Sequence, residues 1–166
     1  MISHGPATRP DHAESPSDAL QLFFRRPLFL SLTIGLPFCV FKMLFGLTAV
    51  HVGSIGSLPI TGPGWLIIFW SLLDLGMNLG REVFDILGKE APFEYCSIAQ
   101  AGRYFQRPMA FLAFDTLLTF TIICTMLWSG WITLLEGLEL HLWYAATTLN
   151  LISLSLVVLY NEIRHP

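Results

Sequence analysis

Long apolar runs alternate with short polar connections along this chain. Four apolar stretches stand out, at about residues 27–50, 64–80, 108–134 and 142–160. Most of them approach the ~20 residues that an α-helix needs to cross the ~30 Å hydrocarbon core of a bilayer. Because unpaired backbone groups cannot face lipid, each run is expected to be helical. The pattern predicts an all-α integral membrane protein with four transmembrane helices.

The polar segments complete this outline. Residues 1–19 are polar and rich in proline, which predicts a disordered cytoplasmic tail followed by a single transmembrane domain over residues 20–166. Residues 51–63 contain three glycines and two prolines, which predicts a turn-rich connection without helix. Over residues 93–105, Phe93, Ile98 and Phe105 share one helical face, and polar residues take the other. This segment is expected to form a short amphipathic helix on the membrane surface, between the second and third spans.

Composition narrows the class of protein. The 166 residues are 54% hydrophobic and 13% charged, with a mean hydropathy of +0.61, which is too apolar for an ordinary soluble domain. The net charge of -3 and the scattered basic residues argue against nucleic-acid binding. No catalytic motif occurs, and His51, Glu136, Glu139 and His141 lack metal-site spacing. We therefore expect neither enzyme activity, nor a cofactor, nor a bound metal.

The basic residues are distributed on one side of the predicted spans. Eight of the nine Lys and Arg residues fall in the N-terminal tail, the central loop or the C-terminus. The two other connections, 51–63 and 135–141, contain none. Since Lys and Arg resist translocation, both termini are expected in the cytoplasm, with the protein in a bacterial-type plasma membrane.

Several residues suit the membrane interface. Arg26, Arg107, Trp65, Trp143 and Tyr160 lie at predicted span ends, where cations meet phosphates and aromatic rings meet head groups.

A weak repeat links the starts of the first and third spans. Phe24–Leu28 and Phe105–Met109 share an aromatic residue, an arginine and a proline at the same spacing, which predicts two helical hairpins of the same orientation. The alternative is independent selection of the same anchor chemistry. The region around Arg107, Ala110 and Asp115 resembles RDD-type membrane proteins, although its Ala-to-Asp spacing differs from that family's pattern by one residue, so the resemblance implies nothing further here.

Lys42 is the leading candidate for a functional residue. A charge inside a span costs several kcal/mol or more unless it reaches the interface or a partner. Small residues at helical spacing surround it, namely Ser31, Gly35, Cys39, Gly46 and Ala49, and Pro37 is expected to kink this helix. The Lys42 face is therefore predicted to contact protein rather than lipid.

Polar stripes on other spans offer partners for Lys42. The second span carries Ser71, Asp74, Asn78 and Arg81, and the fourth carries Thr147, Asn150, Ser153 and Asn161. At ~1.5 Å per residue, Lys42, Asp74 and Asn150 reach a similar depth. Asp115 lies nearer the cytoplasmic side, where we expect it to pair with Arg81 or Arg107.

This polar cluster has three interpretations. It fixes the packing of the bundle, it lines an ion or solute path, or it is satisfied by another subunit. We expect a non-catalytic multipass protein that acts through helix–helix interaction as a membrane-complex subunit, assembly factor or scaffold. The alternative is a small transporter or channel component using Lys42, Asp74, Asn150 and Asp115. The expected partners are membrane lipids and other membrane subunits or further copies of the chain, with no nucleic acid.

Overall fold

The computed structural model describes residues 31–56 and 59–164, and this part of the chain is helical without strands. A π-helical turn, Ser31–Gly35, leads into α3 (Leu36–Gly56). The other elements are α4 (Thr61–Ile86), α5 (Ser97–Tyr104), α6 (Pro108–Trp128), the 3₁₀ turn η2 (Trp131–Leu134) and α7 (Leu138–Arg164). The all-helical prediction is confirmed. The tail, the first copy of the repeat and Arg26 lie outside the described residues, as does the side chain of Tyr160.

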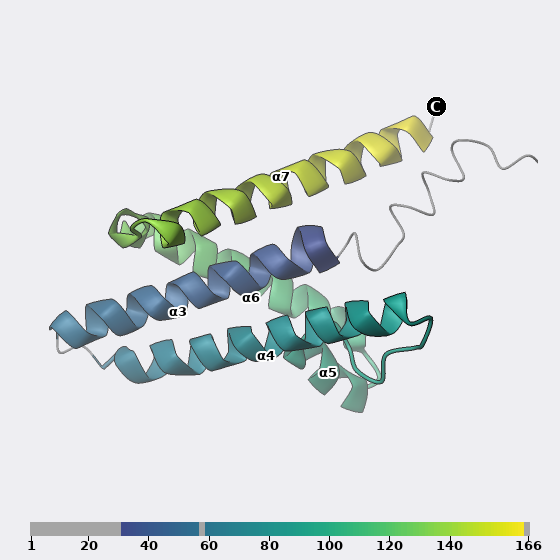
Figure 1. The fold of residues 1–166 in the computed structure, drawn as a ribbon, viewed down its shortest axis with the longest axis horizontal. Helices are drawn as coiled ribbons and strands as arrows, with labels where there is room; N and C mark the ends of the chain where they lie inside the picture. Colours follow the sequence, from purple (N-terminus) through teal and green to yellow (C-terminus); the bar gives the residue numbers. More distant parts are fainter. Residues whose placement is uncertain (1–30, 57–58, 165–166) are drawn as a thin grey trace, which may run out of the picture.

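The four long helices run alternately in opposite directions (Figure 1). α3 and α4 form one antiparallel hairpin, and α6 and α7 form a second. The start of α3, the end of α4, α5, the start of α6 and the end of α7 lie at one end of the bundle (Figure 1). α3 occupies the centre because it packs against α4, α6 and α7. By contrast, α6 and α7 have little contact with each other.

The helix ends differ from the predicted spans. α3 continues to Gly56, and α4 already begins at Thr61, so the expected helix-free connection over 51–63 is wrong. Gly53 has a packing role instead of a turn role, since a Cβ there would clash with Thr61 on α4. α6 ends at Trp128 because Gly130 takes a left-handed conformation, with φ of 72°.

The small-residue face of α3 meets α4, as predicted for protein contact. A Cβ on Gly46 would lie 2.7 Å from Ile68 Cγ1 and 3.0 Å from the Gly64 carbonyl oxygen. Glycines therefore bring the first two long helices close together.

Pro37 lies directly after the π-helical turn that precedes α3. Because proline has no N–H, it cannot donate the helical hydrogen bond to the Thr33 carbonyl, and the helix is widened at this point.

Trp143 belongs to the core, and its predicted role as an interfacial anchor is wrong. The side chain is only 4% exposed, and its ring meets Phe41 edge-to-face with centroids 5.0 Å apart. Because α7 begins at Leu138, Trp143 lies in its second turn and faces α3. Trp65 is 58% exposed and Arg107 is also exposed, so both can reach surroundings outside the bundle.

The predicted central helix is shorter than expected. α5 covers only Ser97–Tyr104, and its N-terminus is capped by Cys96 Sγ, which accepts a hydrogen bond from the Ala99 N–H at 3.4 Å. Phe93 packs edge-to-face on Phe84, with centroids 5.8 Å apart, so it does not share an outward face with α5.

Two described helices are long and apolar enough to cross a membrane. They are Thr33–Gly56 and Pro108–Trp128.

Candidate functional site

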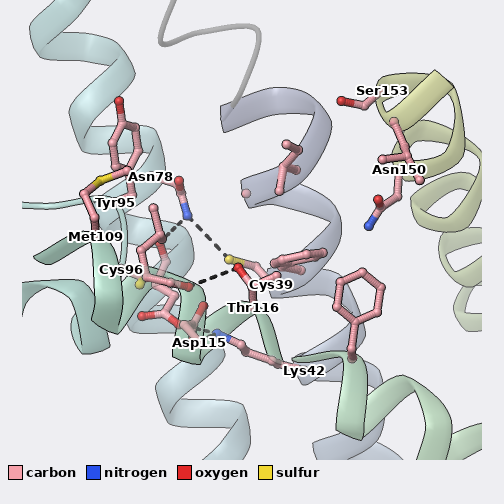
Figure 2. Close-up of a pocket in the computed structure, with 17 residues that line it drawn as sticks. Cys39, Lys42, Asn78, Tyr95, Cys96, Met109, Asp115, Thr116, Asn150 and Ser153 are labelled. Carbon is pink, nitrogen blue, oxygen red and sulfur yellow. Dashed lines mark hydrogen bonds and ion pairs between the residues drawn. The ribbon is translucent and has the colours of Figure 1, made fainter. Parts of the chain in front are cut away.

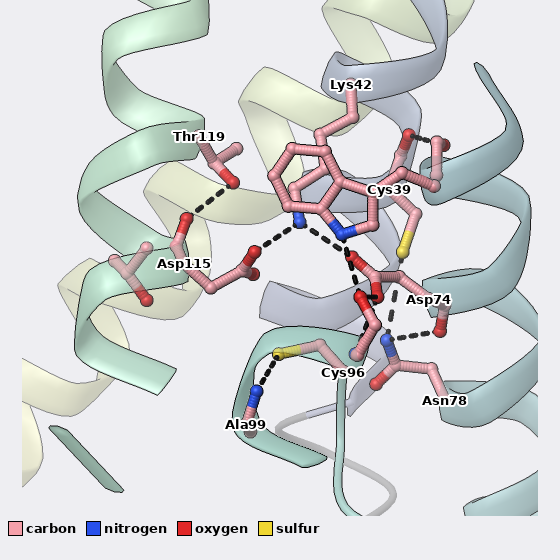
Figure 3. Close-up of polar contacts among 12 residues, drawn as sticks. Cys39, Lys42, Asp74, Asn78, Cys96, Ala99, Asp115 and Thr119 are labelled. Carbon is pink, nitrogen blue, oxygen red and sulfur yellow. Dashed lines mark hydrogen bonds and ion pairs between the residues drawn. The ribbon is translucent and has the colours of Figure 1, made fainter. Parts of the chain in front are cut away.

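Lys42 is held between two carboxylates inside the bundle. Its Nζ lies 2.8 Å from Asp74 Oδ2 on α4 and 2.6 Å from Asp115 Oδ1 on α6. The side chains of Lys42 and Asp74 are each 1% exposed. The predicted contact with Asp74 is present, and Figure 3 shows the amine between the two acids. These three residues are called the ion cluster below.

Asp74 also joins the ion cluster to α5. Its Oδ1 accepts hydrogen bonds from the Ser97 N–H at 2.8 Å and from Ser97 Oγ at 2.6 Å. Ser97 Oγ in turn accepts a hydrogen bond from Trp70 Nε1 at 2.8 Å. The Trp70 ring centroid lies 4.3 Å from Lys42 Nζ, which adds a cation–π contact. Both oxygens of Asp74 are therefore engaged.

Ser71 and Asn78, two further members of the predicted α4 stripe, contact α3. Ser71 Oγ donates to the Cys39 carbonyl at 2.7 Å. Asn78 Nδ2 donates to the Asp74 carbonyl at 3.1 Å and approaches Cys39 Sγ at 3.7 Å. Ser71, Asp74 and Asn78 of the predicted stripe are thus buried inside the bundle.

The expected pairing of Asp115 with Arg81 or Arg107 is wrong. Asp115 lies about two turns into α6, where it faces α3 and Lys42. Arg81 instead donates to the Phe93 carbonyl at 2.9 Å and stacks over the Tyr95 ring at 3.9 Å. Arg81 is therefore bound to the folded segment before α5 instead of to Asp115.

A cavity of about 580 Å³ adjoins the ion cluster. It lies among α3, α4, α6, α7 and the segment before α5, and all three members of the cluster line it. Figure 2 shows this lining, including Lys42 and Asp115. Its apolar lining includes Ile34, Phe38, Met109, Leu112, Phe120 and Leu154. The size and the mainly apolar lining with a few polar groups are typical of ligand sites.

Asn150 shares this cavity with Lys42 but is not bonded to it within the described part of the chain. Figure 2 shows its carboxamide pointing from α7 into the cavity. One turn later, Ser153 is buried and donates to Thr33 Oγ1 at 3.0 Å. Thr147 bonds to the Trp143 carbonyl of its own helix. Asn150 and Ser153 of the α7 stripe line the cavity, and the side chain of Asn161 lies outside the described part of the chain.

Sequence reasoning missed Trp70, Ser97 and Cys96. Trp70 precedes Asp74 by one helical turn, so its position on the same face was available as a signal. Ser97 and Cys96 gave no signal, because their contacts depend on how the segment before α5 folds back. Burial raises the pKa of the Cys96 thiol to about 12, and the nearby Asp115 charge acts in the same direction.

No known protein family, curated protein or solved structure is detectably similar to this chain. The ion cluster and its cavity are therefore interpreted from their own geometry.

Proposed function

We propose that the chain is an integral membrane protein whose four long helices cross the bilayer, with both termini in the cytoplasm of a bacterial-type cell. Large apolar side chains are exposed along the outer helices, including Leu66 and Phe69 on α4, Leu117 on α6, and Leu151 and Leu159 on α7. Soluble monomers rarely leave such extended apolar surfaces in water. The end of the bundle with α5 carries the central-loop basic residues, in agreement with the positive-inside rule.

Its function in this proposal is the non-catalytic binding of another membrane component. The observation that carries it is the cavity beside the ion cluster, on the side where α6 and α7 have little contact. An opening between two lipid-facing helices would admit a molecule laterally from the bilayer. Lys42 and Asp74 are held in close contacts with their neighbours, which suits a fixed recognition site better than a free acid or base.

Native mass spectrometry of protein released in mild detergent tests this binding. Thr116 lines the cavity, whereas Thr121 on the same helix is exposed, and both hydroxyls bond to the carbonyl four residues earlier. Thr116→Trp and Thr121→Trp are therefore matched variants. We expect a lipid or protein subunit that stays with the wild type and with Thr121→Trp but is lost from Thr116→Trp. The same bound components in all three proteins would contradict the proposal.

A transporter component is the second candidate, and one observation favours it. The cavity reaches the charged groups of Lys42, Asp74 and Asp115, and ionisable groups beside a membrane cavity are typical of transport pathways. Solute flux into proteoliposomes by a homo-oligomer, abolished in Thr116→Trp, would favour this candidate over a binding subunit.

A further inference from the structure

We infer that the cavity beside the ion cluster binds a lipophilic cation, a molecule with one delocalised or ammonium-type positive charge inside an apolar body. This inference rests on the proposed function and names the chemical class of the bound component.

The first step is the charge of the ion cluster. One lysine faces two carboxylates, so the three ionised groups carry one excess negative charge. In a low-dielectric surrounding, such an excess is costly until a cation or a proton compensates it. Lys42 would repel a second cation, but its charge is already opposed by both acids at under 3 Å.

The second step identifies which acid faces the ligand. Asp74 uses both oxygens, one on Lys42 and the other on Ser97. Asp115 contacts Lys42 through Oδ1, accepts a hydrogen bond from the Cys96 thiol, which is only a weak donor, and lines the cavity from α6. Asp115 is therefore the acid with capacity left for a further positive charge.

The third step is the match between the rest of the lining and an apolar cation. The rings of Phe38 and Phe120 border the cavity, and aromatic rings attract cations as well as apolar surface. The carboxamide of Asn150 supplies a neutral dipole on the opposite wall (Figure 2). A small hydrated metal ion would leave most of this apolar volume unused.

A pair of ions with the same shape and opposite charge tests the inference. Tetraphenylphosphonium and tetraphenylborate are titrated against the full chain in nanodiscs, with empty nanodiscs as the partition background. We expect saturable binding of the phosphonium ion to the wild type and to Thr121→Trp, and none of the borate ion. Thr116→Trp should abolish the binding. Asp115→Asn, which leaves Lys42 paired with Asp74, should weaken it by about tenfold or more, as expected for losing a charge–charge contact at partial burial.

Each contrary result has a distinct meaning. If both ions bind saturably and only Thr116→Trp removes them, the cavity binds amphiphiles without charge selection, and the cation assignment is overturned while the proposed function stands. If neither ion binds saturably, or if Asp115→Asn binds the phosphonium ion as tightly as the wild type, the cation assignment is also overturned. The native mass spectra then decide separately whether the cavity binds a membrane component. A melting temperature for each variant confirms that it is folded.

Discussion

Replacing Lys42 by methionine should destabilise the protein strongly, because two buried carboxylates would lose their shared cation. Asp74 and Asp115 approach the lysine at 2.8 and 2.6 Å, and the Lys42 and Asp74 side chains are 1% exposed, so solvent screens this pair little. Removing one partner of a buried ion pair costs about 3–5 kcal/mol. For a chain of this length, we expect a fall in melting temperature on the order of 10 °C in detergent.

The geometry also predicts which second change rescues Lys42→Met. From the sequence, the double variant with Asp74→Asn would leave no unpaired charge. The structure corrects this expectation, because Asp115 would remain buried without a cation. The triple variant that also carries Asp115→Asn should recover most of the loss, whereas Asp115→Asn alone should be nearly neutral because Lys42 keeps Asp74.

A thermodynamic cycle over these variants measures the coupling directly. Melting temperature and folded yield by size-exclusion chromatography are recorded for each single, double and triple variant. If the loss from Lys42→Met is below about 1 kcal/mol, or if it is unchanged when both acids are neutralised, the lysine is not stabilised by the two acids. The assignment of the ion cluster would then fail.

Two further predictions concern packing and thiol chemistry. Gly46→Ala should lower the free energy of unfolding by about 1–3 kcal/mol because the new Cβ would clash with α4. Gly76→Ala, which has no atom within 4 Å of its added Cβ, should be neutral or stabilising. Thermal melts compare the two variants, and equal losses would refute close helix contact at Gly46. Cys96 has a pKa raised from 9.0 to about 12, so its thiol should resist iodoacetamide at pH 9 in the native protein and react after unfolding in SDS. Because folding raises the pKa of Cys96, this thiol's contribution to the free energy of unfolding is complete below pH 9, where the thiol is protonated in both states. The contribution is lost as the pH rises toward 12, because the unfolded state loses the proton first. Peptide mass spectrometry reports the labelling, and equal rates in both states would contradict the burial of Cys96.

The sequence alone predicts the presence of the long helices and the contact between two of the three members of the ion cluster. Lys42 and Asp74 are conspicuous because ionisable groups interrupt apolar runs, and a constant rise per residue places them at one depth. The sequence also marks Asp115 as a candidate, but it does not predict the partner of Asp115, because the pairing depends on how α6 packs and on the fold of the segment before α5. Helix packing and loop conformation of this kind leave no periodic pattern in the sequence.

Helix ends explain the other differences. The apolar pattern places the start of the last helix at residue 142 and hence Trp143 at the interface, whereas α7 begins at Leu138. A shift of one turn moves the indole from the end of a helix into the core. Gly53 fits a turn in the sequence pattern, but a glycine within a helix also allows two helices to approach closely, as Gly53 does.

The central claim is that the four long helices cross a bilayer, and a topology measurement tests it most directly. Reporter domains active on only one side of the membrane are fused at Glu90, between α4 and α5, and at Gly137, before α7. The proposal predicts cytoplasmic activity at Glu90 and external activity at Gly137, because eight of the nine basic residues lie on the Glu90 side of the predicted spans. Activity of both fusions on the same side would show that α6 does not cross the membrane, and the four-span account would be rejected.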